Sequence, residues 1–143
     1  MQSQRSTSES KLNQSQDASY QKALATARAA IDKKAENVKI LDLTELSGFT
    51  DYFVICSGLS NRQVQAIADS VEFAGKVKGQ PLVSREGYTD GRWVLLDFGD
   101  VVVHVFLDAL REYYDIENYW ASAPKVKIPS EFYGPAGTVQ RLN

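Results

Sequence analysis

Apolar residues recur at helical spacing in two parts of the chain. From about residue 19 to residue 36 they return every three or four positions, which predicts an amphipathic helix with one buried stripe. The same spacing returns over about 61–78, where Ser60 or Asn61 is a suitable N-cap and Gly79 a suitable terminator. Two helices are therefore expected in the first half of the chain.

Shorter apolar runs of strand length lie around the second helix. Residues 38–43 and 52–57 predict two strands, and the second run is uninterrupted, as in a strand that is covered on both faces. A short strand is expected at 82–84, followed by a polar loop over 85–91. The last helix is expected over about 108–120.

Residues 92–107 predict a β-hairpin. They form two apolar strands joined by Gly99-Asp100, a two-residue loop of the kind that lets a hairpin keep its natural twist. In this register Phe98 faces Val101, on a side of the hairpin that is wholly aliphatic or aromatic. We expect that side to belong to the core.

The opposite side of the hairpin is mixed in chemistry. Trp93 faces Phe106 there, and Asp97 and the single histidine, His104, lie on the same side. An acid, an imidazole and an indole together are unusual for a sheet surface that merely packs. A role beyond core filling is therefore expected at this surface.

The order of these elements indicates an α/β domain with a single mixed β-sheet and flanking helices. The strand–helix–strand unit over 52–84 is expected to be a right-handed crossover between parallel strands, and the hairpin adds antiparallel strands. A chain of 143 residues suits one domain, which we place at 19–120. Residues 1–18, rich in Ser and Gln, are predicted to be disordered, and 121–143, with three Pro and two Gly, to form a loose tail.

Composition narrows the classes of function. The formal net charge of -2 argues against a protein that coats nucleic acid through a basic field, and no sequence-specific contact with nucleic acid is expected. No stretch approaches the length of a membrane span. Cys56, the only cysteine, excludes an internal disulfide and is expected to be a small buried residue. A cytoplasmic protein is expected, with an organelle-targeting role of residues 1–18 as the weaker alternative.

Two constellations allow an enzymatic interpretation. The turn Ser57–Ser60 lies between a strand and a helix, where backbone N–H groups can bind phosphate. A nucleotidyltransferase would also need two carboxylates one residue apart on the next strand, and residues 82–84 hold none. Asp97 and His104 could orient a base or a metal ligand. A tight turn and a packed histidine are the favoured interpretations, and we expect no catalytic residue, cofactor or metal cluster.

Aromatic and acidic side chains gather in the second half of the chain. On one helix Tyr113 and Tyr114 point about 100° apart, so at least one of them is partly exposed. Aromatic anchors ringed by polar groups are typical of protein interfaces. Trp93 suits the core and an interface equally well. The full set is Trp93, Phe98, Phe106, Tyr113, Tyr114, Tyr119 and Trp120, with Asp97, Asp100, Asp108 and Glu112 among them.

Four segments resemble one known family. They are Thr50–Gly58, Ser60–Asp69, Trp93–Phe106 and Arg111–Trp120, and together they cover roughly residues 20–120 in one order. In these segments the chain resembles the ribosomal silencing factors, also called Iojap-like proteins. The resemblance implies a small mixed α/β fold related to the nucleotidyltransferase domain.

The resemblance also implies a function. Members bind protein fourteen of the large ribosomal subunit and sterically block joining of the small subunit, which lowers translation when nutrients are short, and homodimers occur. The positions that we carry over as partner-binding residues are Trp93, Asp97, Phe98, Asp100 and Tyr114. Two alternatives stay open: a large-subunit assembly factor, and a nucleotide-binding enzyme of the nucleotidyltransferase type.

Overall fold

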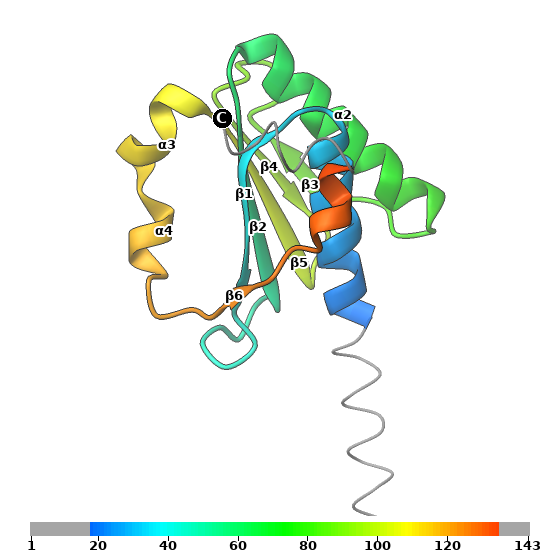
Figure 1. Ribbon diagram of the computed structural model, residues 1–143, viewed down its shortest axis with the longest axis vertical. Helices are drawn as coiled ribbons and strands as arrows, with labels where there is room; N and C mark the ends of the chain where they lie inside the picture. The colour runs from blue at the N-terminus through cyan, green and yellow to red at the C-terminus, as the bar shows by residue number, and fades with distance from the viewer. Residues whose placement is uncertain (1–17, 135–143) are drawn as a thin grey trace, which may run out of the picture.

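One six-stranded sheet organises the protein, as shown in Figure 1. The structure is a computed structural model that describes residues 18–134. Across the sheet the strands follow the order β3-β4-β5-β2-β1-β6. Their bounds are β1 Glu36–Asp42, β2 Tyr52–Gly58, β3 Ser84–Glu86, β4 Trp93–Asp97, β5 Val101–Leu107 and β6 Lys125–Val126.

Helices cover the two faces of the sheet unequally. Figure 1 shows a helix over residues 18–32 and α2 on one side, and α3 and α4 on the other. The 3-10 helix η1 lies on the same side as α2. The bounds are α2 Asn61–Val77, α3 Asp108–Tyr114, α4 Ile116–Tyr119 and η1 Ser130–Tyr133.

The predicted α/β fold with a single mixed sheet is confirmed. β2 and β5 are parallel neighbours, and the other neighbouring pairs are antiparallel. These pairings make β3 run in the same direction as β2, as predicted for the two ends of the strand–helix–strand unit. The two strands are not neighbours, however, because the β4–β5 hairpin lies between them.

The predicted register of the hairpin is confirmed. Trp93 pairs with Phe106 and Asp97 with Val102, and the backbone N–H of Phe98 donates to the carbonyl of Val101 at 2.9 Å. The loop glycine, Gly99, has a φ of 92°, which a glycine adopts at little cost.

The main core lies between the sheet and the helix pair. Aliphatic side chains of every central strand meet the helix over 18–32 and α2, both of which have an apolar stripe. Phe98 belongs to this core and is 5% exposed. A Cβ atom at Gly75 of α2 would lie 2.5 Å from Cε1 of Phe98, so the glycine lets this ring pack against the helix.

Several of the predicted boundaries are wrong, including those of β1, which was expected over 38–43. The helix over 18–32 ends four residues earlier than predicted, because Lys34 has a positive φ and β1 already begins at Glu36. β3 is shifted from the predicted 82–84 to Ser84–Glu86, because its partner β4 ends at Asp97, which lies opposite Ser84. The loop predicted over 85–91 is therefore shorter, since its first two residues belong to β3.

The last helix is interrupted rather than continuous. Asp115 adopts a left-handed conformation with φ 53°, which separates α3 from α4. The break brings Glu117 back to Arg111, whose guanidinium donates to both carboxylate oxygens at 2.9 and 3.1 Å. Arg111 is buried and also donates to the hydroxyl of Ser57, so the ion pair fixes α3 and α4 to the sheet.

The predicted loose tail is wrong for its first part. β6 pairs with β1 through Ile40 and Val126, and Phe132 of η1 packs against the main core. Such short elements have no detectable apolar period, which is why the sequence pattern missed them. Residues 135–143 lie outside the described residues, as does the predicted disordered segment 1–18 except for Ala18, which is helical.

Candidate functional site

The second face of the sheet is only partly covered. Under α3 and α4 it is closed by a smaller core that includes Phe106, Ile55 and Leu41. Next to this core, Trp93 and Leu95 of β4 are only half-buried. We call the uncovered part, formed by β3, β4 and β5 with the loop residue Phe49, the open face.

An aromatic cluster marks the border between α3 and the open face. The ring of Trp93 stacks on Phe106, with centroids 5.0 Å apart, and lies 4.7 Å from the ring of Tyr114. Tyr113 is 80% exposed and Tyr114 is 39% exposed, so the prediction that at least one of them reaches solvent is confirmed. Trp93 is therefore packed within the cluster and still partly exposed.

His104 lies beneath this cluster as a neutral, buried side chain. Its Nδ1 accepts a hydrogen bond from the indole N–H of Trp93 at 3.2 Å. Burial lowers the pKa of the imidazole to about 4, so the ring is uncharged at neutral pH. Asp97 instead accepts from the backbone N–H of Gly99 at 2.7 Å. The carboxylate thus stabilises the hairpin loop, and the alternative acid–base pair with His104 is not formed.

A hollow of about 400 Å³ lies on the open face beside the aromatic cluster. Its walls are mostly apolar, and its charged lining residues are two carboxylates, those of Glu86 and Asp97. Three separate segments build it: the β1–β2 loop and β2, the region around β3, and the hairpin. The lining residues are Phe49, Phe53, Val83, Glu86, Leu95, Asp97, Gly99, Val102 and His104.

The five predicted partner-binding residues do not form one patch. Trp93, Asp97 and Tyr114 lie on or beside the open face, whereas Phe98 is buried in the main core on the other side. Asp100 faces the helix over 18–32 and accepts from Lys22 Nζ at 2.6 Å and from the Ser19 hydroxyl at 2.9 Å. Phe98 and Asp100 are therefore placed to support the hairpin from behind.

Two exposed residues of the open face were missed in the sequence. Val83 is 72% exposed, and Phe49 is also largely exposed, although both are apolar. They come from segments predicted as a strand and a turn, and no local pattern shows that the fold brings them to the hairpin. Leu95 had a usable signal, because it alternates with the core residues of β4.

The Ser57–Ser60 turn has a structural role in the described chain. The hydroxyl of Ser60 caps α2 by accepting from the backbone N–H of Gln63 at 3.1 Å. The Gln63 side chain in turn accepts from the N–H of Leu59 at 2.7 Å. A Cβ at Gly58 would meet Val64 at 2.9 Å, so this glycine allows α2 to approach β2. Two of the N–H groups near this turn, those of Leu59 and Gln63, are therefore bonded within the protein.

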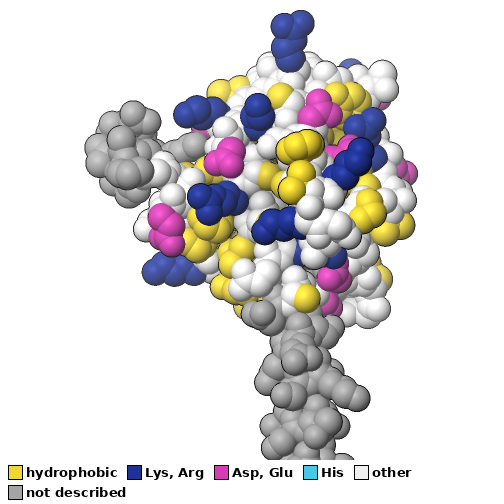
Figure 2. Space-filling model, turned by 90° about the vertical axis from the view of Figure 1, so that its right-hand side faces the viewer, with side chains coloured by type: hydrophobic (Ala, Val, Ile, Leu, Met, Phe, Trp, Pro, Cys, Tyr) yellow, Lys and Arg dark blue, Asp and Glu magenta, His cyan; other side chains and the backbone are white. Residues whose placement is uncertain are grey.

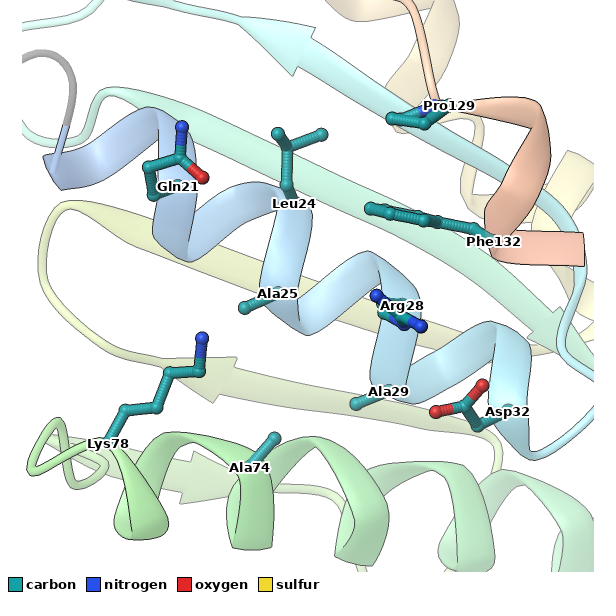
Figure 3. Close-up of a pocket in the computed structure, with 10 residues that line it drawn as sticks. All are labelled: Gln21, Leu24, Ala25, Arg28, Ala29, Asp32, Ala74, Lys78, Pro129 and Phe132. Atoms are coloured by element: carbon teal, nitrogen blue, oxygen red, sulfur yellow. The ribbon is translucent and has the colours of Figure 1, made fainter.

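A second hollow, of about 460 Å³, lies on the helix side of the sheet, as shown in Figure 3. Ala25 and Ala29 face Ala74 of α2, and the guanidinium of Arg28 lies over the ring of Phe132 at 5.2 Å. No buried polar atom without a partner lines it within the described chain. Figure 2, which faces this side, shows basic and acidic side chains interspersed among apolar ones, so no field of one sign covers it.

The metal-ligating and nucleophilic side chains within residues 18–134 do not form a further candidate site. No group of three or more His, Cys, Asp or Glu there is placed to hold a metal ion. Cys56 is fully buried, as predicted, and burial raises the pKa of its thiol to about 12, which keeps it protonated. In this part of the chain no helix has the length and apolar character of a membrane span.

These features define a class: a small α/β protein with one closed sheet face and one open, aromatic face. A family model described as "Ribosomal silencing factor during starvation" matches residues 16–140. The chain belongs to this family of ribosomal silencing factors, which confirms the resemblance.

Relatives and solved structures agree with this assignment. A ribosomal silencing factor from Halalkalibacterium halodurans is 45% identical over 111 residues, which cover 77% of this chain and 95% of that protein. A mouse protein named for mitochondrial assembly of the ribosomal large subunit is 32% identical over 91 residues, covering 62% of this chain and 40% of that protein. A crystal structure of a Chromobacterium violaceum protein superimposes with a TM-score of 0.70 at 36% identity, covering 87% of this chain and 98% of the other.

Proposed function

We propose that this protein is a translational repressor that binds the large ribosomal subunit through ribosomal protein fourteen and blocks joining of the small subunit. The observation that carries the proposal is the open face. It leaves a half-buried tryptophan, an exposed tyrosine pair and a hollow on a sheet whose other face is covered by the helix over 18–32 and α2. A monomer gains nothing by leaving such rings accessible, whereas interfaces use them as anchors.

The charge of the face favours a basic partner. Glu86 and Asp97 border the hollow, and the whole chain has a formal net charge of -2. Positively charged partners are attracted to such a surface, which raises the association rate and disfavours acidic ones. We propose Trp93, Asp97 and Tyr114 as contacts, with Phe98 and Asp100 supporting the hairpin.

Sedimentation of ribosomes with the purified protein tests the proposal. We expect the protein to travel with the large subunit, and the fraction of joined ribosomes to fall as its concentration rises. A protein that stays at the top of the gradient, or that binds without reducing joined ribosomes, would rule out the repressor function. Sedimentation of the protein alone tests whether a second copy of the chain occupies the open face instead.

A role in large-subunit assembly is the second candidate. The name of the mouse relative, which refers to assembly of the mitochondrial large subunit, favours it. The two functions use the same contact surface but different targets. Recovery of the protein with precursor subunits in preference to mature ones would favour assembly, and an effect on mature subunits alone would favour repression. The same mouse name supports an organelle as the alternative to the cytoplasm that we propose.

We propose a non-enzymatic mechanism, because the Ser57–Ser60 turn serves to cap α2 and the N–H groups of Leu59 and Gln63 are bonded within the protein. Calorimetry with nucleoside triphosphates and Mg²⁺ tests this. Heat of binding with a Kd below about 100 µM, which corresponds to roughly 5.5 kcal/mol, would revive the nucleotide-binding alternative.

A further inference from the structure

α3, the helix that carries the exposed tyrosine pair, is anchored to the sheet by a charged residue. It has seven residues, fewer than the roughly 12–15 that an isolated helix needs to be stable. Leu107 at its N-cap cannot close it with a side-chain hydrogen bond, and Arg111 is the only α3 residue that is buried in the described chain. The following helix, α4, packs only partly, through Ile116 and the C-cap residue Trp120. The attachment of α3 therefore depends on Arg111.

Arg111 is held by an ion-pair network that reaches two strands. Its guanidinium donates to both carboxylate oxygens of Glu117, at 2.9 and 3.1 Å, and to the hydroxyl of Ser57 in β2 at 2.9 Å. Lys39 of β1 binds the same Glu117 carboxylate at 3.0 Å. A pair of parallel hydrogen bonds between arginine and a carboxylate fixes direction as well as distance. We call Ser57, Arg111, Glu117 and Lys39 the Arg111 network.

The Arg111 network lies directly behind the aromatic cluster. Side chains three positions apart lie on the same side of a helix, so Tyr114 is carried by the same side of α3 as Arg111. The ring centroid of Tyr114 lies 4.7 Å from that of Trp93 and 5.9 Å from that of Phe106. A rotation or displacement of α3 would therefore separate Tyr114 from Trp93.

We propose that Arg111 and Glu117 are positioning residues for partner binding. Their ion pair, held on Ser57 and Lys39, keeps Tyr114 against Trp93 and so sets the shape of the contact surface. Arg111 is 5% exposed, so it acts from behind this surface. The proposal rests on the proposed function and adds a requirement to it, namely that the aromatic contacts depend on charged residues behind them.

A double-mutant cycle tests whether Glu117 acts through Tyr114. Glu117→Gln keeps the size of the side chain and one oxygen acceptor but removes the charge that pairs with Arg111. In pelleting assays with purified large ribosomal subunits, we expect Glu117→Gln to weaken binding about three- to tenfold. Adding it to Tyr114→Ala should weaken binding no further, because a ring that is absent cannot be misplaced. Independent, multiplying losses, or full binding by Glu117→Gln, would overturn the proposal.

Glu112→Gln is the matched control for charge. Glu112 is an exposed residue of the same helix, so its substitution removes the same charge and leaves the Arg111 network intact. We expect it to change binding less than about twofold at the same salt concentration. A loss as large as that of Glu117→Gln would assign the effect to attraction of a basic partner, and the positioning role would be wrong.

Hydrogen exchange of the isolated protein gives a readout that needs no ribosome. We expect Glu117→Gln to speed exchange several-fold for the backbone N–H groups of α3, with no change in β2 and β5, since the loss of the ion pair loosens α3 locally. Unchanged exchange in α3 would overturn the proposal. If the unmodified protein fails to bind large subunits, the proposed function is wrong, and the exchange result still decides whether the Arg111 network holds α3 in place.

Discussion

The two faces of the sheet differ in their side chains and in how far helices cover them. The face toward the helix pair is lined by aliphatic residues such as Val94, Leu96 and Val103, all fully buried. The opposite face of the same β4–β5 hairpin carries Trp93 and His104 and is closed only where α3 and α4 lie over it. Both faces are rich in apolar residues, so apolar content does not distinguish core from surface. The mixture of indole, imidazole and carboxylate does.

The largest expected effect is on the closed face. Phe98→Ala removes a ring packed against Gly75 and leaves a cavity in the main core, so the free energy of unfolding should fall by about 3–5 kcal/mol. Urea denaturation measures this. Tyr113→Ala is the matched control, because Tyr113 is exposed and its loss should change stability by less than about 0.5 kcal/mol. Equal losses in both variants would erase the distinction between the faces.

The second effect is a pH dependence that originates at the border of the open face. The pKa of His104 is about 4 in the folded protein and 6.5 in its ordinary state, so between these values the unfolded chain binds more protons. Stability should therefore fall as the pH falls from 6.5 to 4, by roughly 3 kcal/mol in total. Unfolding at several pH values, compared with His104→Phe, isolates this contribution. Parallel curves for the two proteins would show that His104 titrates normally.

The third effect is on binding rather than on folding. Trp93→Ala should weaken binding to the large subunit about thirtyfold or more, as expected for an aromatic anchor worth roughly 2 kcal/mol. Loss of the ring contacts with Phe106 and Tyr114 should lower the free energy of unfolding by less than about 1.5 kcal/mol. Phe73→Ala, an exposed aromatic residue of α2, is the control. A large fall in melting temperature with binding retained would mean that Trp93 is structural.

The smallest effect is electrostatic. Asp97→Lys should slow association with a basic partner several-fold at low salt, and the difference should shrink as salt is added. Asp97→Asn keeps an oxygen that can accept from Gly99 and so separates the charge from the loop hydrogen bond. Stopped-flow association rates at two salt concentrations decide the matter. Identical salt dependence in the three proteins would remove Asp97 from the contact.

The hairpin could be predicted because its information is local. A two-residue loop containing a glycine sets the register, and the alternation of side chains then assigns each residue to a face. The same reasoning placed Trp93 and His104 together and put Phe98 in the core. Which partner His104 would bond, Trp93 rather than Asp97, depends on side-chain rotamers that alternation does not determine.

The features that the sequence did not predict depend on contacts between segments that are distant in the chain. β6 is two residues long and is fixed by its pairing with β1. The break at Asp115 occurs together with the ion pair between Arg111 and Glu117, which joins the two sides of the break. The hollow needs Val83 and Phe49 to meet the hairpin, which only the complete sheet brings about. No window of sequence contains these relationships.

The parallel pairing of β2 with β5 also affects the order in which the protein folds. Val54 pairs with Val103, so the central ladder joins residues roughly fifty positions apart and must close a long loop, a slow step in folding. Trp93, His104 and Phe106 belong to the hairpin whose second strand is fixed by that ladder. During synthesis the surface therefore assembles only after the ribosome has released residues beyond Leu107. A nascent chain that stops before Leu107 therefore lacks the surface that we propose to contact ribosomes.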